Sequence, residues 1–326
     1  MSRVVVVTGA SAGVGRATAQ AFAKRGDTVA LLARGEDGLA GAAVEVESFG
    51  GRALSIVTDV ADPDQVEAAA ARVEAELGPI DVWVNVAMTT VFSEFKDLTP
   101  DDYRRATEVT YLGYVWGTMA ALKRMLPRDR GTIIQVGSAL AYRAIPLQAP
   151  YCGAKFAIRG FTDSIRTELL HDRSNVQITM VQLPAVNTPQ FNWCKTNLPR
   201  HPQPVPPIYQ PEVPAEAIVW AAEHRRRELW VGGPTVLAIL GNKLAPSFAD
   251  RYLARTGFNG QQTHEPVDPE RPSNLYEPVA ALHATHGIFD DRSSSKSREL
   301  WAATHRRVLL AAAALALVGA LAARAY

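Results

Sequence analysis

Short runs of apolar residues alternate with segments of helical periodicity from residue 3 to about residue 232. The stretch VVVV at residues 4–7 is unbroken by polar residues, which is typical of a strand buried on both faces. The pattern predicts strands near residues 3–8, 28–33, 53–58, 80–86, 132–137, 176–183 and 228–231. Helices are expected between them, near residues 14–25, 36–49, 63–77, 101–126, 151–171 and 212–225.

The regular alternation of strands and helices predicts the fold class. Neighbouring parallel strands need a crossover connection, which is usually a helix that packs on one face of the sheet. We therefore predict an α/β, doubly wound Rossmann fold with a seven-stranded parallel sheet flanked by helices. Residues 1–232 are expected to form this domain.

The chain changes character after the last predicted strand. Residues 234–255 have a helical pattern, whereas residues 257–292 contain four prolines and are expected to be irregular. A polar helical segment near 294–307 leads into the stretch VLLAAAALALVGALAA at residues 308–323. We predict a partly helical extension over residues 233–307, followed by an apolar tail helix.

Two interpretations of the apolar tail are open. Its sixteen uncharged residues would form a helix about 24 Å long, close to the roughly 30 Å thickness of a bilayer core. Arginines flank the segment and could reach both membrane interfaces. The alternative is a helix packed on the protein or on a second subunit, because alanines recur at four-residue spacing. We favour a C-terminal membrane anchor, with the rest of the chain in the cytoplasm.

The composition narrows the class of protein. The chain has 326 residues, of which 47% are hydrophobic and 21% charged, and this suffices for a large core. The net charge of +1 gives no reason to expect a nucleic-acid partner. The two cysteines indicate no disulfide framework, and the seven histidines show no metal-ligand spacing. The first strand begins at residue 3, so we expect no signal peptide.

The segment TGASAGVG joins the first strand to the first helix. It places three glycines, Gly9, Gly13 and Gly15, where the backbone must turn sharply and a helix must begin. The free N–H groups and the positive dipole end of such a helix bind phosphate. The loop therefore predicts a diphosphate cradle at the carboxyl edge of the sheet. A tight strand–helix connection without a ligand is the alternative.

Residues after the second and third strands bear on which dinucleotide would bind. An acidic residue after the second strand would hold the ribose 2′-hydroxyl of NAD, but this chain has Ala33 followed by Arg34. An arginine suits a 2′-phosphate, so the pattern favours NADP(H), and a solvated arginine is the alternative. Asp59 follows the third strand and could either accept a hydrogen bond from the adenine amino group or cap the next helix.

The segment YCGAK places Tyr151 and Lys155 four residues apart on one face of a predicted helix. A nearby ammonium favours the phenolate and is expected to lower the pKa of Tyr151 from its usual value of about 10. Tyr151 could then exchange a proton with a hydroxyl or carbonyl oxygen. Ser138 follows another strand at the same sheet edge, where its hydroxyl could polarise a carbonyl. Taken alone, each feature has an ordinary explanation as a chance pair or a turn residue.

The order of these motifs resembles that of the short-chain dehydrogenase/reductase family over about residues 3–232. The resemblance implies a catalytic triad of Ser138, Tyr151 and Lys155, in which Lys155 also binds the nicotinamide ribose hydroxyls. It further implies NADP(H) as the cofactor, hydride transfer at the nicotinamide C4, and assembly into a homodimer or homotetramer. The residues that it assigns to cofactor binding are Gly9, Ser11, Gly13, Val14, Gly15, Arg34, Asp59, Val60, Asn85, Ala87, Tyr151, Lys155, Pro184, Val186 and Thr188.

The family's motifs after the fourth and sixth strands are matched in part. The segment PAVNT resembles the Pro-Gly motif, in which the backbone of Val186 and the side chain of Thr188 would hold the nicotinamide carboxamide. Met88 stands where the family has a glycine, and Ala185 replaces the glycine of the Pro-Gly pair. Thr110 takes the place of a catalytic asparagine, so we count it among the candidate catalytic residues. We expect these departures to affect turnover more than the fold.

Residues 189–211 form a long proline-rich segment that carries Phe191, Trp193 and Tyr209. Long loops at this place often cover a substrate, and the aromatic residues suggest an apolar one; anchoring of the loop itself is the alternative. We predict an NADP(H)-dependent enzyme that interconverts an alcohol and a carbonyl of a lipophilic substrate, with residues 1–232 as its dinucleotide-binding and catalytic domain. The alternatives are a dinucleotide-binding sensor or scaffold without turnover, and an epimerase or dehydratase on the same fold.

Overall fold

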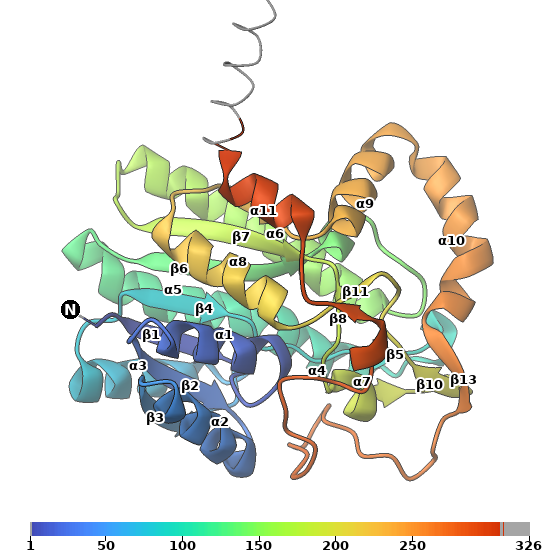
Figure 1. The fold of residues 1–326 in the computed structure, drawn as a ribbon, viewed down its shortest axis with the longest axis horizontal. Helices are drawn as coiled ribbons and strands as arrows, with labels where there is room; N and C mark the ends of the chain where they lie inside the picture. Colours follow the sequence, from blue (N-terminus) through green and yellow to red (C-terminus); the bar gives the residue numbers. More distant parts are fainter. Residues whose placement is uncertain (1, 307–308, 310–326) are drawn as a thin grey trace, which may run out of the picture.

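The computed structural model describes residues 2–306 and 309, and its centre is a parallel sheet of seven strands (Figure 1). The strands lie in the order β12-β7-β6-β4-β1-β2-β3, which confirms the predicted doubly wound sheet. β1 lies between β2 and β4, so the winding direction reverses there and the loops after these strands leave a crevice. The strands are β1 (Val4–Thr8), β2 (Thr28–Ala33), β3 (Arg52–Val57), β4 (Val82–Asn85), β6 (Thr132–Ser138), β7 (Gln177–Leu183) and β12 (Glu228–Trp230).

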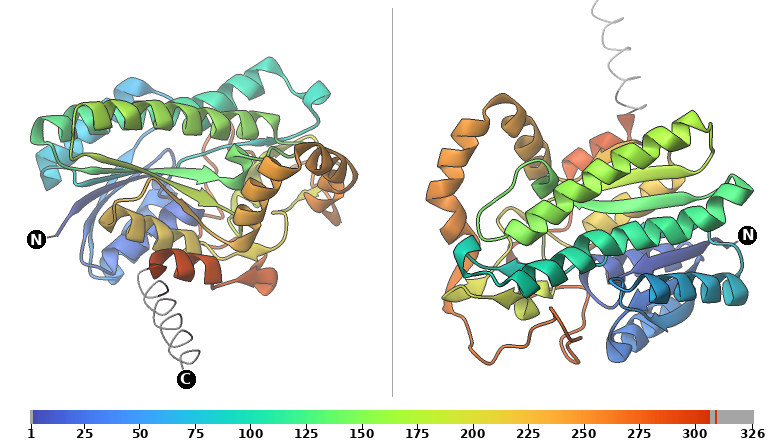
Figure 2. Two further views of the ribbon diagram at one scale, coloured as in Figure 1. Left: turned by 90° about the horizontal axis from the view of Figure 1, so that it is seen from above. Right: turned by 180° about the vertical axis from the view of Figure 1, so that it is seen from behind.

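Helices cover both faces of the sheet (Figure 2). The apolar run of β1 supplies the core on both sides, because Val5 and Val7 pack under one helical layer while Val4 and Val6 pack under the other. Successive side chains of a strand point to opposite faces, which explains the unbroken valine run. The first layer contains α1 (Gly13–Ala23), α2 (Glu36–Ser48) and α8 (Glu212–Glu223). The second contains α3 (Pro63–Leu77), α5 (Gly113–Met125) and α6 (Ala149–His171).

The single helix predicted over residues 101–126 is interrupted in the structure. The segment consists of α4 (Pro100–Thr107), a π-helical turn over Glu108–Leu112, and α5. At the start of α5, a Cβ on Gly113 would come within 2.8 Å of a methyl carbon of Val60. The helix backbone therefore lies directly against the loop after β3, an approach that hydrophobic periodicity does not encode. Single π-helical turns of this kind are frequent at functional sites.

The helical pattern near residues 234–255 is divided into two helices. α9 (Gly233–Leu244) ends at Leu244, and Ala245 alone separates it from α10 (Pro246–Gly260). The division falls at Pro246, because a proline lacks the backbone N–H that would continue α9 but is well suited to the first position of a new helix. α10 also extends into the region that the sequence predicts to be irregular.

The predicted substrate loop and the extension are joined by short strands. β10 (Arg200–Pro202) pairs antiparallel with β13 (Gln262–Pro266). β11 (Ile208–Tyr209) pairs with β8 (Ala185–Val186) on one side and with β14 (Ser293–Ser294) on the other. Two segments that the sequence predicts to be irregular therefore order each other through backbone hydrogen bonds. Shorter elements in the same region are β5 (Val91–Phe92), α7 (Gln190–Trp193) and β9 (Lys195–Thr196).

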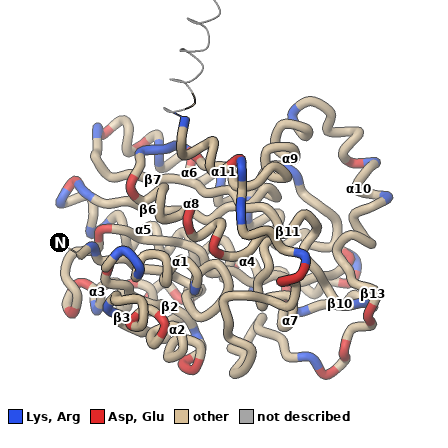
Figure 3. The backbone as a smooth tube through the Cα atoms, viewed as in Figure 1, with Lys and Arg blue, Asp and Glu red and all other residues tan. Residues whose placement is uncertain are grey.

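The described chain ends near α11 (Arg298–Thr304), which is shorter than the helix predicted near residues 294–307. Its Leu300 packs into the core on the side of α8. Within residues 2–306 the structure contains no helix that is both long and apolar enough to cross a bilayer. The predicted tail helix at residues 308–323 lies outside the described residues, apart from Leu309. Acidic and basic residues are intermixed along the described chain (Figure 3).

Candidate active site

A cavity of about 540 Å³ lies at the carboxyl edge of the sheet and is lined by residues from the glycine loop, from β6 and from α6. It brings together most of the residues that the sequence analysis singled out. Those in its wall are Gly9, Ser11, Gly13, Val14, Gly15, Arg34, Asp59, Val60, Ala87, Ser138, Tyr151, Lys155, Pro184, Val186 and Thr188. Asn85 and Thr110 are absent from the wall, whereas Met88 is part of it.

The glycine loop turns through close backbone contacts. Gly9 and Gly13 have φ angles of +66° and +55°, which residues with a side chain rarely adopt. A Cβ on Gly15 would collide with the carbonyl oxygen of Gly9, so this position also requires glycine. No side chain caps α1, and the Gly13 N–H donates to the carbonyl of Ala284 at 2.9 Å. The N-terminal end of α1 thus lines the cavity, where its remaining N–H groups suit a phosphate.

Arg34 follows β2 and reaches a distant part of the chain. Its guanidinium donates to the carbonyl oxygens of Tyr276, at 2.7 Å, and of Asn274. Burial lowers the pKa of Arg34, with the nearby Asp59 carboxylate acting in the opposite direction. The side chain is therefore held at the cavity wall by the backbone. A guanidinium has five N–H donors, so Arg34 can also donate hydrogen bonds to a phosphate.

Asp59 follows β3 and forms an ion pair with Arg105 of α4 at 2.5 Å. The interpretation of Asp59 as a helix cap is wrong, because Asp62 accepts the N–H groups at the start of α3. Val60, the next predicted site residue, is buried and packs against the start of α5. Asp59 and Val60 are therefore held in place by other parts of the chain, in the part of the cavity wall where the sequence predicts the adenine to bind.

The three predicted catalytic residues lie in one wall of the cavity. Ser138 ends β6, and Tyr151 and Lys155 lie in the first two turns of α6. The Ser138 hydroxyl accepts a hydrogen bond from the N–H of Leu140 at 3.1 Å. The Lys155 ammonium donates to the carbonyl of Val136 at 2.8 Å and lies 5.5 Å from the centroid of the Tyr151 ring. This arrangement can polarise a substrate oxygen and exchange a proton with it.

The electrostatics of this cluster differ from the sequence prediction. Burial raises the pKa of Tyr151 to about 12, against the opposing effect of the Ser138 hydroxyl. Burial also lowers the pKa of Lys155 to about 7. Burial of the two groups therefore opposes the lowering of the Tyr151 pKa that the sequence predicts from Lys155, because desolvation disfavours the charged form of each group. Tyr151 is held as a neutral proton donor at neutral pH.

Tyr114 belongs to the cluster and was missed by the sequence analysis. Its hydroxyl, from α5, donates to the Val136 carbonyl at 3.0 Å and accepts from the Lys155 ammonium at 3.1 Å. The side chain is fully buried, and burial raises the pKa of Tyr114 well above its usual value. Two of the three N–H groups of Lys155 are thus bound by the protein. The available signal was the position of Tyr114 one turn after Thr110.

Two predicted site residues have structural roles. Asn85 is fully buried in the core, where its side-chain amide accepts from Trp83 at 2.8 Å and donates to Gln135 at 3.0 Å. The Thr110 hydroxyl donates to the carbonyl of Thr89 at 2.7 Å and accepts from the N–H of the same residue at 3.0 Å. Both side chains fix the segment around the end of β4. Neither residue belongs to the cavity wall, so the cofactor-binding role of Asn85 and the catalytic role of Thr110 stay predictions from the sequence.

Thr188 lies beside the glycine loop, where a Cβ on Gly13 would come within 3.0 Å of its methyl carbon. Among the described residues its buried hydroxyl has no hydrogen-bond partner. A buried unpaired hydroxyl is costly unless a ligand completes it. A carboxamide would supply both a donor and an acceptor, so Thr188 and the glycine cradle together fit a nicotinamide dinucleotide.

A family model described as short chain dehydrogenase matches residues 3–197. The chain belongs to the short-chain dehydrogenase family. It is 33% identical over 321 residues to the uncharacterized oxidoreductase YxnA of Bacillus subtilis (strain 168). The matched region covers 96% of this chain and 88% of that protein. It is 35% identical over 192 residues to the 3-dehydrosphinganine reductase of Danio rerio, which covers 57% of each. A solved structure of an actinorhodin polyketide ketoreductase variant with NADPH matches with a TM-score of 0.64 and 27% identity, over 72% of this chain and 97% of that chain.

The rest of the cavity of this short-chain dehydrogenase is lined mainly by apolar residues. Of the aromatic residues predicted to face a substrate, Phe191 and Trp193 lie in the wall, whereas Tyr209 lies against Gly232 instead. Further wall residues come from the loop after β6, from the segment between β10 and β11, and from α9 and α10. They include Ile145, Val205, Pro206, Ala238, Tyr252 and Leu253. The contribution of α9 and α10 was missed because these helices carry no recognisable motif.

Proposed function

We propose that the protein is an NADP(H)-dependent oxidoreductase that interconverts an alcohol and a carbonyl by hydride transfer. The observation that carries the proposal is the single cavity whose wall contains Ser138, Tyr151 and Lys155 together with the glycine loop. The ketoreductase that matches this fold was crystallised with NADPH. Arg34 supplies a guanidinium after β2 that suits the 2′-phosphate of the same cofactor.

Each residue of the cluster has a role that its position allows. Ser138 donates a hydrogen bond to the substrate oxygen. Tyr151, whose pKa of about 12 keeps its hydroxyl protonated, donates that proton during carbonyl reduction and is left as the phenolate. Alcohol oxidation requires the phenolate, which accepts the proton of the substrate hydroxyl. Lys155 uses its remaining N–H group to hold a ribose hydroxyl and so orients the cofactor. NADP(H), when bound, supplies or accepts the hydride.

A lipophilic carbonyl compound is the proposed substrate class. Support comes from the apolar residues that line the cavity beyond the catalytic cluster, such as Ile145, Val205 and Leu253. A relative that is named for reduction of 3-dehydrosphinganine is in line with this class. We assign residues 1–232 to the dinucleotide-binding and catalytic domain and residues 233–307 to an extension that completes the substrate side. A homodimer or homotetramer is proposed from the family resemblance.

Consumption of NADPH in the presence of lipophilic ketones tests the proposed reaction. We expect NADPH to be oxidised while an equal amount of alcohol forms, as measured by absorbance and by product chromatography. NADPH binding without turnover of any ketone or alcohol would favour the sensor or scaffold. Product formation without net consumption of NADPH would favour an epimerase or dehydratase.

Arg34→Ala is expected to abolish a preference for NADPH over NADH. In the parent protein NADPH should bind at least about tenfold more tightly, a difference of about 1.4 kcal/mol, because only NADPH offers a 2′-phosphate to the guanidinium. Titration by nicotinamide fluorescence measures both constants, and their ratio in the variant should approach one. Arg25→Ala, which removes an exposed arginine paired with Glu223, should leave the ratio unchanged. A preference that survives in Arg34→Ala contradicts the assignment.

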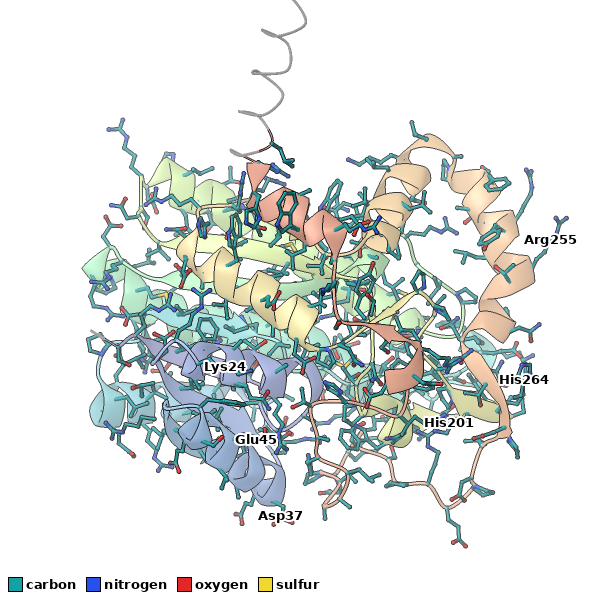
Figure 4. The ribbon with its side chains drawn as sticks, in the orientation of Figure 1. Lys24, Asp37, Glu45, His201, Arg255 and His264 are labelled. Carbon is teal, nitrogen blue, oxygen red and sulfur yellow. The ribbon has the colours of Figure 1, made fainter. Side chains whose placement is uncertain are left out.

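We also propose that the chain associates with a membrane through residues 308–323, with the catalytic domain in the cytoplasm. Support comes from the sequence of that segment and from a stripe of exposed apolar side chains on α9 and α10, in which Leu244 is 85% and Phe248 is 69% exposed. Arg255 points outward from α10 and could meet an anionic headgroup (Figure 4). The full chain should sediment with phosphatidylglycerol-containing vesicles, and a chain lacking residues 308–326 should do so much less. Equal sedimentation of the two contradicts an anchor.

A further inference from the structure

Residues 274–290, which we call the strap, cross the carboxyl edge of the sheet far from any sequence motif. In Figure 1 the strap is the orange loop that passes beside α7 and α2. The strap begins beside α7, where the N–H of Asn274 donates to the carbonyl of Trp193 at 2.9 Å. Contacts with α2 lie near its middle, where the ring of His283 lies against Gly38. The strap therefore spans the crevice in which the sheet changes its winding direction.

The start of the strap is fastened to α4. The Tyr276 hydroxyl donates to the carboxylate of Asp102 at 2.7 Å, and this carboxylate is almost completely buried. Leu275 is fully buried, and its carbonyl accepts from Arg105 at 3.2 Å. Hydrogen bonds to charged groups contribute more than those between neutral groups, so this end is firmly held.

The end of the strap is fastened to α1 and to the segment after β8. Arg16 donates to the carbonyl of His283 at 3.1 Å, and Gln20 donates to the hydroxyl of Thr285 at 2.9 Å. The side-chain oxygen of Asn187, a fully buried residue, accepts from the N–H of Phe289 at 3.1 Å. The two ends are thus attached to opposite sides of the crevice by independent contacts.

The first part of the strap, residues 274–283, lines the predicted adenosine side of the cavity. Asn274, Pro278, Val279 and His283 belong to the same cavity wall as the glycine loop. A Cβ on Gly38 would come within 2.6 Å of Nδ1 of His283, so the ring lies directly on the start of α2. This Nδ1 atom is buried and has no hydrogen-bond partner among the described residues.

Backbone carbonyls of the strap also reach two groups that the proposed function gives to the cofactor phosphates. The carbonyl of Ala284 accepts from Gly13, and those of Asn274 and Tyr276 accept from Arg34. These carbonyls are neutral, whereas a phosphate is charged and binds an N–H group more strongly. Four strap residues line the same cavity of about 540 Å³ as the glycine loop, so the strap forms part of the wall of this cavity.

We propose that the strap is part of the cofactor site: it closes over NADP(H), retains the dinucleotide, and must open for cofactor exchange. The proposal rests on the proposed function, because it takes NADP(H) as the ligand. In a short-chain dehydrogenase with this strap, the release of NADPH is limited by detachment of the strap. Weakening the attachments of the strap accelerates release, while association changes less.

The double variant Tyr276→Phe, Thr285→Val tests this role. The first change removes the hydroxyl bonded to Asp102, and the second removes the hydroxyl bonded to Gln20. We expect the release rate of NADPH to rise about tenfold, with a matching rise in Kd. The rate is measured by stopped flow, as the loss of nicotinamide fluorescence when the complex is mixed with excess NADP⁺. Gly160→Ala is the control, because a Cβ there meets no atom within 4 Å, and it should release NADPH like the parent.

An unchanged release rate in the double variant would overturn the proposal. Slower release or tighter binding would overturn it as well, because the strap would then compete with the cofactor phosphates. Hydrogen exchange of the parent protein gives a measurement that needs no variant: the amides of residues 274–290 should exchange more slowly with saturating NADPH, and equal exchange overturns the proposal.

The two proposals fail in distinguishable ways. A parent protein that binds no NADPH overturns the proposed function and removes the ligand on which the strap would act. A parent protein that binds and oxidises NADPH, but whose strap variants release it at the parental rate, overturns the role of the strap alone. The measurements use the full chain in both cases.

Discussion

Tyr151→Phe is expected to lower kcat for carbonyl reduction by about 10²- to 10⁴-fold, since the variant keeps the ring but loses the hydroxyl proton. The Kd of NADPH should change by no more than about twofold, because the glycine loop, Arg34 and Lys155 remain. Burial raises the pKa of Tyr151 to about 12, so the parent hydroxyl stays protonated throughout the neutral range. The loss should therefore be the same at pH 6 and pH 8. Steady-state kinetics and fluorescence titration measure the two quantities.

Tyr103→Phe is the matched control for this variant. Tyr103 packs edge-on against Phe95 and lies outside the cavity wall, so its hydroxyl should not affect turnover. A Tyr151→Phe protein with parental kcat would contradict the assignment of Tyr151 as the proton donor. If the parent protein binds NADPH but turns over no carbonyl or alcohol, the sensor or scaffold becomes the better interpretation.

The sequence predicts those parts of the fold that depend on residues a few positions apart in the chain. The valines of residues 4–7 indicate a strand buried on both faces, and the structure divides them between two cores. The glycine spacing predicts a strand–helix turn because Gly9, Gly13 and Gly15 meet steric limits within a few residues. Helical spacing likewise places Tyr151 and Lys155 on one side of α6, since a difference of four residues fixes their direction.

The parts that the sequence does not predict depend on distant contacts. Motif position places Asn85 and Thr110 near the site, but their side chains are bound by core partners and by the backbone of Thr89. The carbonyls that hold Arg34 lie 240 and 242 residues further along the chain. The direction of a pKa shift depends on how fully a side chain is desolvated, and spacing alone does not give that quantity.

Lys155→Met should abolish most activity and yet stabilise the fold. The ammonium is fully buried and burial lowers the pKa of Lys155 to about 7, so a charged Lys155 costs folding free energy. Methionine keeps a similar length without a charge, and the Val136 carbonyl still accepts from Tyr114. We expect the free energy of unfolding to rise by about 2 kcal/mol at pH 6. The carbonyl reductase activity should fall by about 10²-fold or more, because the cofactor ribose and the proton path lose their positioning residue.

The stability difference between Lys155→Met and the parent should shrink as the pH rises. Between pH 7 and the usual lysine pKa of about 10.5, the unfolded parent binds a proton at this residue that the folded parent does not. The free energy of unfolding of the parent therefore increases with pH in this interval, while that of the variant gains nothing from position 155. Urea unfolding at pH 6 and pH 9 measures the change. Lys123→Met, which removes an exposed lysine paired with Glu67, is the control, and its free energy of unfolding should differ from that of the parent by the same small amount at pH 6 and pH 9. A stability difference between Lys155→Met and the parent that stays constant with pH would contradict a lowered pKa of Lys155.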